Sequence, residues 1–83
     1  MYDVQLKPRA LKDLQDLPKS DARRMVEKLK SLEQGLSGDI KRLTDFTPEY
    51  RLRVGDYRAL FEVDGSRIVV YRILHRRSVY EKR

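Results

Sequence analysis

The segment YRLRVGDYRALFEV (residues 50–63) decides the fold, because apolar residues alternate with other residues on both sides of a Gly-Asp pair. Alternation with a period of two is typical of β-strands that bury one face. A Gly-Asp pair supplies the positive φ that a tight two-residue turn requires. The segment therefore predicts an antiparallel hairpin of strands 50–54 and 57–63.

The same pattern continues after the next glycine. The segment RIVVYRIL (67–74) is apolar and β-branched, and Asp64-Gly65 precedes it. If each glycine-containing pair forms a two-residue turn, the register of all three strands is fixed. Arg58 then lies opposite Arg53 on one side and opposite Tyr71 on the other. The sequence thus predicts a three-stranded meander.

Side chains alternate between the two faces of a sheet, so this register assigns each residue to a face. The predicted core face carries Tyr50, Leu52, Val54, Tyr57, Ala59, Phe61, Val63, Ile68, Val70 and Leu74. The opposite face carries Arg51, Arg53, Arg58, Leu60, Val69, Tyr71, Ile73 and His75. Like charges on neighbouring strands repel, which costs stability. Clustered arginines on one face therefore favour an anion-binding site.

The first half of the chain reads as a strand followed by helices. Residues 2–7 alternate like a strand, and Pro8 suits the first turn of a helix that Pro18 closes. Ser20 is a good N-cap for a second helix, and residues 39–49 read as a loop. The apolar stripe predicted for the second helix is Ala22, Met25, Val26, Leu29, Leu32 and Leu36.

These elements predict a single α+β domain over residues 1–83, in the order β-α-α-β-β-β. An N-terminal strand and a helical hairpin precede the three-stranded antiparallel meander, and the helices pack on one face of the sheet. No cysteine is present, and no apolar run reaches the length of a membrane span. We expect a cytoplasmic protein without a membrane anchor.

Charge points to a polyanionic partner. The chain carries 19 Lys and Arg against 13 Asp and Glu, a net charge of +6. A field of this sign attracts nucleic acid, the ribosome or an acidic protein segment. The excess is greatest in residues 65–83, which hold six basic residues and one acidic residue. One histidine and scattered carboxylates offer no cluster of metal ligands, so we expect neither a metal nor another cofactor.

The segment YRILHRRSVY (residues 71–80) ends the last predicted strand with a group of cations and a tyrosine. We expect His75, Arg76, Arg77 and Tyr80 to lie at one edge of the arginine-bearing face. Guanidinium groups bind phosphate oxygens in pairs, and aromatic rings stack on bases. This edge is therefore interpreted as the lip of an RNA-phosphate site.

Three segments resemble the RelE/ParE superfamily of bacterial and archaeal toxins. They are RALKDLQDL after the first strand, YRLRVGDYRALFEV in the middle and HRRSVY near the end. For the RelE branch, the resemblance implies a ribosome-dependent endoribonuclease that cuts messenger RNA at the A site. In this reaction the 2′-OH attacks the adjacent phosphate without a metal. A co-encoded antitoxin is the implied protein partner, and messenger RNA and ribosomal RNA are the implied nucleic-acid partners.

The resemblance also implies catalytic residues. The family positions fall on Arg51, Arg53, Arg58, either Arg76 or Arg77, and Tyr80. The well-known RelE pattern has lysines at the first two positions. Because arginine keeps its proton, it cannot act as a base. Proton transfer is then expected from Tyr80 or from His75, whose residue type titrates near about pH 6.5.

Two other functions are compatible with the same surface. The ParE branch has the same fold but inhibits DNA gyrase, and those toxins generally lack the full cationic set with a terminal tyrosine. A non-catalytic RNA- or ribosome-binding module would use the basic face only for phosphate affinity, with strong salt dependence. The nuclease function is favoured because this chain retains the full set.

Overall fold

In the described part of the chain, five strands form one sheet in the order β1-β5-β4-β3-β2. The computed structural model describes the backbone of residues 1–43 and 47–81 and, within these, the side chains as far as residue 79. Strand β1 is parallel to β5, and the other neighbours are antiparallel. The elements are β1 (Asp3–Leu6), α1 (Pro8–Gln15), α2 (Lys19–Ser31), the 3-10 helix η1 (Leu32–Gln34), β2 (Ile40–Arg42), β3 (Tyr50–Val54), β4 (Tyr57–Asp64), β5 (Arg67–His75) and α3 (Arg76–Glu81). The predicted α+β fold is confirmed, with a short edge strand and a C-terminal helix added to it.

The register of the β3–β4 hairpin is the predicted one. Val54 faces Tyr57 and Arg53 faces Arg58, so Gly55-Asp56 is a two-residue turn. Gly55 has a φ of 61°, in the left-handed region that glycine adopts at low cost. The hairpin therefore places Arg53 and Arg58 side by side on one face of the sheet.

The register of the β4–β5 hairpin differs from the predicted one. Asp64 pairs with Arg67, so the turn consists of Gly65 and Ser66 rather than Asp64 and Gly65. Gly65 has a φ of 61°, the value found at Gly55. Both turns thus begin with their glycine, and this shared geometry shifts the pairing. Val63 faces Ile68, not Ser66 as predicted.

A β-bulge in β5 changes the register a second time. Phe61 pairs with Val70 but Leu60 pairs with Arg72, so Tyr71 is an extra residue. The Nζ atom of Lys7 lies 5.6 Å from the centre of the Tyr71 ring, within the range of a cation–π contact.

The bulge reverses the facing of the rest of β5. Ile73 is buried in the main core, whereas the prediction placed Leu74 there. Arg58 faces Leu74 rather than Tyr71, and His75 faces Tyr57 on the core side. The predicted position of His75 on the arginine-bearing face is therefore wrong, because one inserted residue exchanges the two faces.

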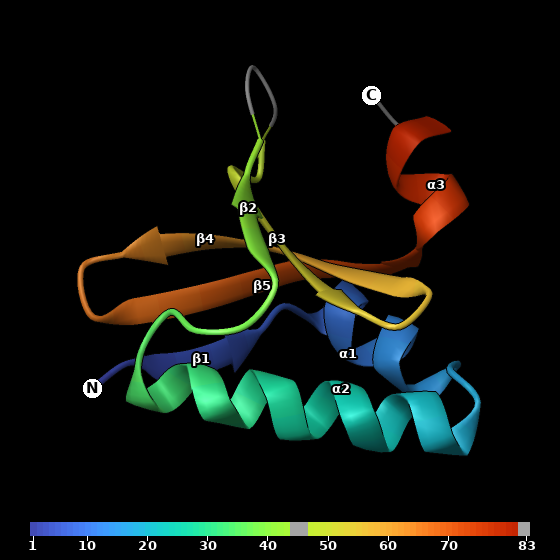
Figure 1. The fold of residues 1–83 in the computed structure, drawn as a ribbon, viewed down its shortest axis with the longest axis horizontal. Coiled ribbons are helices and arrows are strands. Elements are labelled where there is room, and N and C mark those ends of the chain that lie inside the picture. Colours follow the sequence, from blue (N-terminus) through green and yellow to red (C-terminus); the bar gives the residue numbers. More distant parts are fainter. Residues whose placement is uncertain (44–46, 82–83) are drawn as a thin grey trace.

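Helices α1 and α2 cover one face of the sheet, as predicted (Figure 1). The buried core between these helices and the sheet comprises Ala10, Met25, Leu29, Leu32, Leu52, Val54, Ala59, Phe61, Ile68, Val70 and Ile73. The predicted stripe of α2 is only partly core, since Val26 and Leu36 are 43% and 42% exposed. Helix α2 begins at Lys19 after Pro18, so Ser20 is not its N-cap as predicted.

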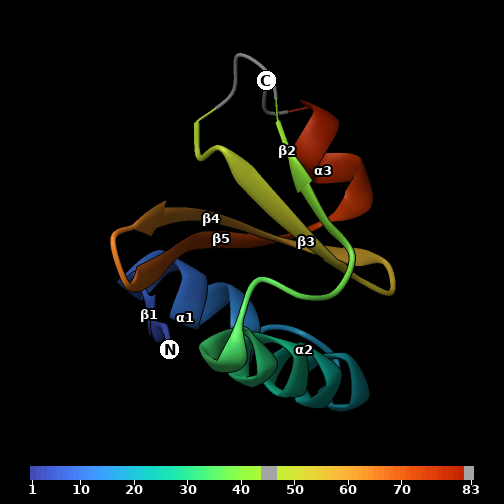
Figure 2. The same cartoon turned by 60° about the vertical axis from the view of Figure 1, so that its left-hand side comes forward.

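Helix α3 lies on the other side of the sheet from α2 (Figures 1 and 2). It contacts β4 and β5. Leu60 on β4 and Val79 on α3 are buried but stand outside the main core, so they belong to a second, smaller apolar layer. No helix among the described residues is long and apolar enough to span a membrane.

An ion pair joins α1 to β5 just after the bulge. The Arg72 guanidinium donates two hydrogen bonds to the Asp13 carboxylate, from Nε at 2.7 Å and from Nη2 at 3.2 Å. The Ile73 N–H donates a third at 3.0 Å. Burial raises the pKa of Asp13, but these hydrogen bonds and the positive charges of Arg72 and Arg9 outweigh it and leave the pKa below its usual value.

Candidate functional site

Cationic side chains from two neighbouring strands share the sheet face that α1 and α2 leave open. Arg51 and Arg53 alternate along β3 with Leu52 and Val54. Because Leu52 and Val54 are buried in the core, the two arginines point to the opposite face of the sheet. Lys41 on β2 pairs with Arg51 across the ladder, and its neighbour Ile40 packs against the core. We call Lys41, Arg51 and Arg53 the basic face.

Lys41 is the residue of this face that the sequence prediction missed. Residues 39–49 were expected to form a loop, but Ile40–Arg42 forms strand β2 along the edge of β3. The signal was the alternation of one apolar residue, Ile40, with an exposed lysine. Three residues give too short a pattern to separate a strand from a loop.

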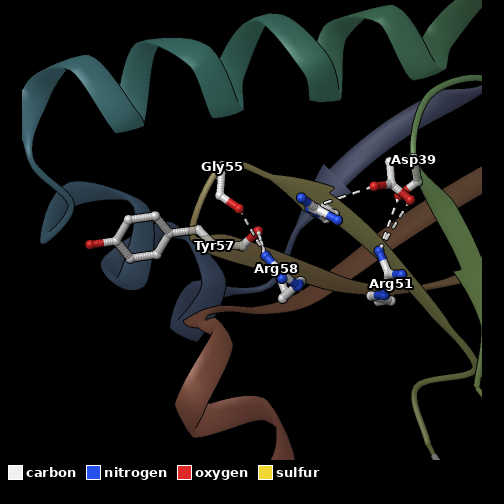
Figure 3. A network of polar contacts seen from close by, with 6 residues as sticks. Asp39, Arg51, Gly55, Tyr57 and Arg58 are labelled. Carbon is white, nitrogen blue, oxygen red and sulfur yellow. Dashed lines mark hydrogen bonds and ion pairs between the residues drawn. The ribbon is translucent and has the colours of Figure 1, made fainter.

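The Asp39 carboxylate contacts both arginines of the basic face, and Figure 3 shows it beside Arg51. Its Oδ1 atom is 3.5 Å from Nη1 of Arg51, and its Oδ2 atom is 3.6 Å from Nε of Arg53. The Asp39 carbonyl accepts a hydrogen bond from the Arg53 N–H at 2.9 Å. The Arg51 side chain is 14% exposed, whereas Arg53 and Asp39 are 57% and 52% exposed. The basic face thus already holds one internal anion.

Arg58 occupies a more buried position at the β3–β4 turn. It is 8% exposed, and its Nη1 donates to the carbonyls of Gly55 at 3.0 Å and Tyr57 at 3.1 Å (Figure 3). Helix α3 begins beside the same turn, because the Arg76 N–H donates to the Asp56 carbonyl at 2.8 Å. Arg58 therefore braces the β3–β4 turn, which ends the strand that carries Arg51 and Arg53 and contacts the start of α3.

His75 lies apart from the basic face. Its ring packs edge-on against Tyr57, with ring centres 5.5 Å apart and an angle of 89° between the planes. Its Nδ1 accepts a hydrogen bond from the Arg77 N–H at 3.3 Å. The histidine thus joins the end of β5 to the first turn of α3.

Arg76 and Arg77 are exposed on the first turn of α3. Neither takes part in an ion pair among the described residues. The side chain of Tyr80 lies outside the described residues. Within those residues, no three His, Cys, Asp or Glu side chains gather closely enough to hold a metal ion.

An apolar groove of about 270 Å³ lies between β1, α1 and α2, on the opposite side from the basic face. Leu11 on α1 and Val26 on α2 line it and are 47% and 43% exposed. Lys30 and Glu33 add charge to the lining. Exposed aliphatic side chains beside a groove often mark a binding surface.

The strand order, the helical hairpin and the cationic strands agree with the sequence relationships of the chain. The sequence profile described as "ParE toxin of type II toxin-antitoxin system, parDE" matches residues 4–80. The chain belongs to the RelE/ParE toxin superfamily. The RelE1 protein of Methanocaldococcus jannaschii is 33% identical to this toxin over 86 residues, with 96% of each chain covered.

Two further relatives carry the RelE name. Toxin RelE3 of the same organism is 46% identical over 43 residues, a match that spans 52% of this toxin and 49% of RelE3. The toxin also resembles a chain in the crystal structure of the RelB-RelE antitoxin-toxin complex from Methanococcus jannaschii. That similarity has a TM-score of 0.75 and 32% identity, and covers 94% of this toxin and 96% of that chain. The matching profile carries the ParE name, so membership of the superfamily does not by itself assign the target.

Proposed function

We propose that this toxin cleaves messenger RNA in the ribosomal A site, as the RelE branch of the superfamily does. The 2′ oxygen of one nucleotide forms a bond to the adjacent phosphorus, and the bond from phosphorus to the 5′ oxygen breaks. The products are a 2′,3′-cyclic phosphate and a 5′-hydroxyl. The observation that carries this proposal is the side-by-side placement of Lys41, Arg51 and Arg53 on one face.

The two arginines of the basic face would stabilise the negative charge that develops on the phosphate oxygens. Arg51 and Arg53 extend from the same face of one strand, and both guanidinium groups contact one anion, the Asp39 carboxylate. Charge-assisted hydrogen bonds from guanidinium to phosphate are short and strong. A rigid hairpin holds these donors before the substrate binds, which is what transition-state stabilisation requires.

Proton transfer needs a group other than arginine. One proton must leave the 2′-OH and one must reach the 5′ oxygen. Lysine is used in proteins as a general base, whereas arginine is not. We assign these steps to Lys41 and Tyr80. The expected role of His75 has no support from its position, because its ring lies on the core side beside Tyr57.

Arg76 and Arg77 complete the proposed substrate contacts from α3. Their side chains are exposed and lie on the helix that packs over the open face of the sheet. Arg58 would act by holding the β3–β4 turn and the start of α3 in place. Because ribosomes are the proposed site of action, the toxin would work in the cytoplasm.

The test is an A-site cleavage assay in a purified translation system. Ribosomes are stalled with a defined codon in the A site, a chelator is added at a level that leaves them intact, and RNA 3′ ends are mapped. We expect cuts within that codon, and a loss of about 100-fold or more with Arg53→Ala. Arg67→Ala is the matched control. Arg67 is an exposed arginine at the β4–β5 turn, at the opposite end of β4 from the β3–β4 turn beside Arg53.

A histidine variant tests whether His75 takes part in proton transfer. His75→Asn keeps a side-chain acceptor for the Arg77 N–H and removes the titrating ring. The cleavage rate of this variant should fall far less than the roughly 100-fold expected when a general acid or base is removed. Intact messenger RNA with the folded, antitoxin-free wild type would contradict the nuclease proposal.

The match to a ParE profile favours inhibition of DNA gyrase as the second candidate function. A supercoiling assay with purified gyrase distinguishes the two. Block of supercoiling without any A-site cleavage would assign the toxin to the ParE branch. Binding to ribosomes without cleavage or gyrase inhibition would leave a non-catalytic RNA-binding module, with the basic face serving phosphate affinity alone.

We also propose that a co-encoded antitoxin binds this toxin. One of its solved relatives is a RelB-RelE antitoxin-toxin complex. The apolar groove between β1, α1 and α2 offers a seat for the apolar side chains of an amphipathic segment. The net charge of +6 would attract an acidic segment to the rest of the surface.

A further inference from the structure

Asp39 places its carboxylate where a phosphate would bind to the basic face. Each carboxylate oxygen faces a different guanidinium, Oδ1 that of Arg51 and Oδ2 that of Arg53. A phosphate has oxygens with the same charge and a similar spacing, and guanidinium groups bind both anions in the same way. A substrate phosphate that contacts both arginines must therefore replace this carboxylate.

We propose that Asp39 is a built-in competitor of the RNA phosphate, and that it sets the affinity and the salt dependence of the basic face. This inference rests on the proposed RNA-cleaving function. Asp39 would lower the affinity of the basic face for any RNA. Only a substrate that other contacts hold in position would then displace its carboxylate. Asp39 would thus restrain the toxin from binding stray RNA.

The geometry of the Asp39 contacts suits a pair that opens readily. Its distances to Arg51 and Arg53 are 3.5 and 3.6 Å. About half of the Asp39 and Arg53 side chains is exposed, and Arg51 is the buried partner at 14%. The Asp13–Arg72 pair in the same chain shows the opposite arrangement. It is 2.7 Å long, largely buried and supported by a backbone N–H. Exposed pairs contribute little to stability, whereas buried ones are costly to break.

The backbone of Asp39 stays in place when the carboxylate leaves. Its carbonyl accepts the Arg53 N–H at 2.9 Å, which continues the ladder between β2 and β3. Rotation of the side chain alone therefore removes the carboxylate from both guanidinium groups, while Nη1 of Arg51 keeps its contact with the Asp39 carbonyl at 3.4 Å. The fold does not need to open, and the arginines remain on the same face.

The experiment measures binding of a short single-stranded 2′-O-methyl RNA, which the toxin cannot cleave. Fluorescence anisotropy is recorded at several salt concentrations for the wild type and for Asp39→Asn, a variant that keeps size and removes charge. We expect the variant to bind about 1.4- to 5-fold more tightly, which corresponds to the range of about 0.2–1 kcal/mol that exposed ion pairs span. Its plot of log affinity against log salt should steepen by roughly 0.7, as for one more phosphate contact.

Two controls separate a local effect from a change in overall charge. Glu27→Gln removes one negative charge from an exposed position on α2, on the other face of the sheet, and should leave binding unchanged. Arg53→Gln added to Asp39→Asn should remove most of the gain. Asp39→Ala should bind as tightly as Asp39→Asn, because both variants lack the charge.

Unchanged binding by Asp39→Asn would overturn the inference. Weaker binding would overturn it too and would show that Asp39 orders the arginines instead. An equal gain from Glu27→Gln, or no binding by any form, would overturn it as well. The A-site cleavage assay is a separate readout. If the wild type cleaves and Asp39→Asn binds RNA as the wild type does, only the inference about Asp39 is wrong. If Asp39→Asn binds RNA more tightly but no form of the toxin cleaves, the proposed nuclease function is wrong.

Discussion

The Asp13 carboxylate on α1 accepts hydrogen bonds from both the side chain of Arg72 and the N–H of Ile73 on β5. Strand β1 pairs with β5 only as far as Val70. Beyond that point, Asp13 supplies the acceptor that a neighbouring strand would otherwise provide. One carboxylate thus fastens helix α1 to the sheet where the strand pairing ends.

This contact predicts a loss of stability in Asp13→Asn. The substitution leaves Arg72 without its charged partner and weakens the bond to Ile73, at a cost of roughly 1–3 kcal/mol. Chemical denaturation at pH 7 measures it. Glu49→Gln is the matched control, because the Arg42–Glu49 pair is exposed and should change stability by about 0.5 kcal/mol or less.

The same carboxylate predicts the direction of the pH dependence. The pKa of Asp13 is lower in the folded chain than in the unfolded one, so its stabilising effect is complete above the unfolded value of about 4. It is lost as the pH falls through the folded value. The difference in stability between the wild type and Asp13→Asn should therefore shrink in acid. A constant difference from pH 7 down to pH 2 would contradict this prediction.

The two hairpin turns form a matched pair for a second prediction. Gly55 and Gly65 share a φ of 61°, so alanine at either position should cost about 1–2 kcal/mol through backbone strain. An added methyl group at Gly55 would also lie 3.4 Å from Nη1 of Arg24, while nothing lies within 4 Å at Gly65. The exposed Arg24 side chain can move aside, so thermal unfolding should show similar losses in Gly55→Ala and Gly65→Ala. Only Gly55→Ala should also slow cleavage, since its turn holds Arg58.

The proposed role of Lys41 in proton transfer predicts that two substitutions at this position affect RNA binding and cleavage differently. Lys41→Arg keeps the charge beside Arg51 but removes a group able to exchange its proton. It should bind RNA as the wild type does and cleave about 100-fold more slowly. Lys41→Gln should lose binding as well. Arg42→Gln on the same strand is the control, and equal cleavage by Lys41→Arg and the wild type would exclude lysine as the proton carrier.

The apolar groove predicts a separation of antitoxin binding from cleavage. Leu11→Ser combined with Val26→Ser should weaken binding of the antitoxin at least about tenfold, or about 1.4 kcal/mol. Cleavage should not change, since the groove lies on the far side of the sheet from the basic face. Leu36→Ser is the control, because Leu36 is 42% exposed but does not line the groove. Titration calorimetry with the co-encoded antitoxin measures both.

The β3–β4 hairpin and its arginines could be predicted because one turn motif fixes one register. The β4–β5 hairpin could not, since the segment DGSR (64–67) contains two pairs that each include the glycine. The bulge left no trace in the pattern either. Ile73 and Leu74 are both apolar, so exchanging them between faces changes nothing in the alternation.

The candidate site was predicted in part for related reasons. Arg51 and Arg53 lie on the predicted face, because five alternating residues define β3. His75 does not, since its position depends on the bulge before it. Asp39 and Lys41 went unrecognised because β2, which follows Asp39 and contains Lys41, is only three residues long. Short edge strands take their structure from a neighbour rather than from their own sequence.

The extra residue at Tyr71 has a consequence for how this chain tolerates insertions and deletions. Loss of a single codon there would leave the composition of β5 almost unchanged but restore the simple pairing. Arg72 would stand opposite Leu60 and Ile73 opposite Ala59, as they do in the bulged strand, so the side chains from Arg72 to His75 would keep their faces. Deletion of one residue between Arg72 and His75 would instead exchange the faces of the residues that follow it, up to the start of α3. One-residue deletions at Tyr71 should therefore inactivate the toxin less often than those between Arg72 and His75.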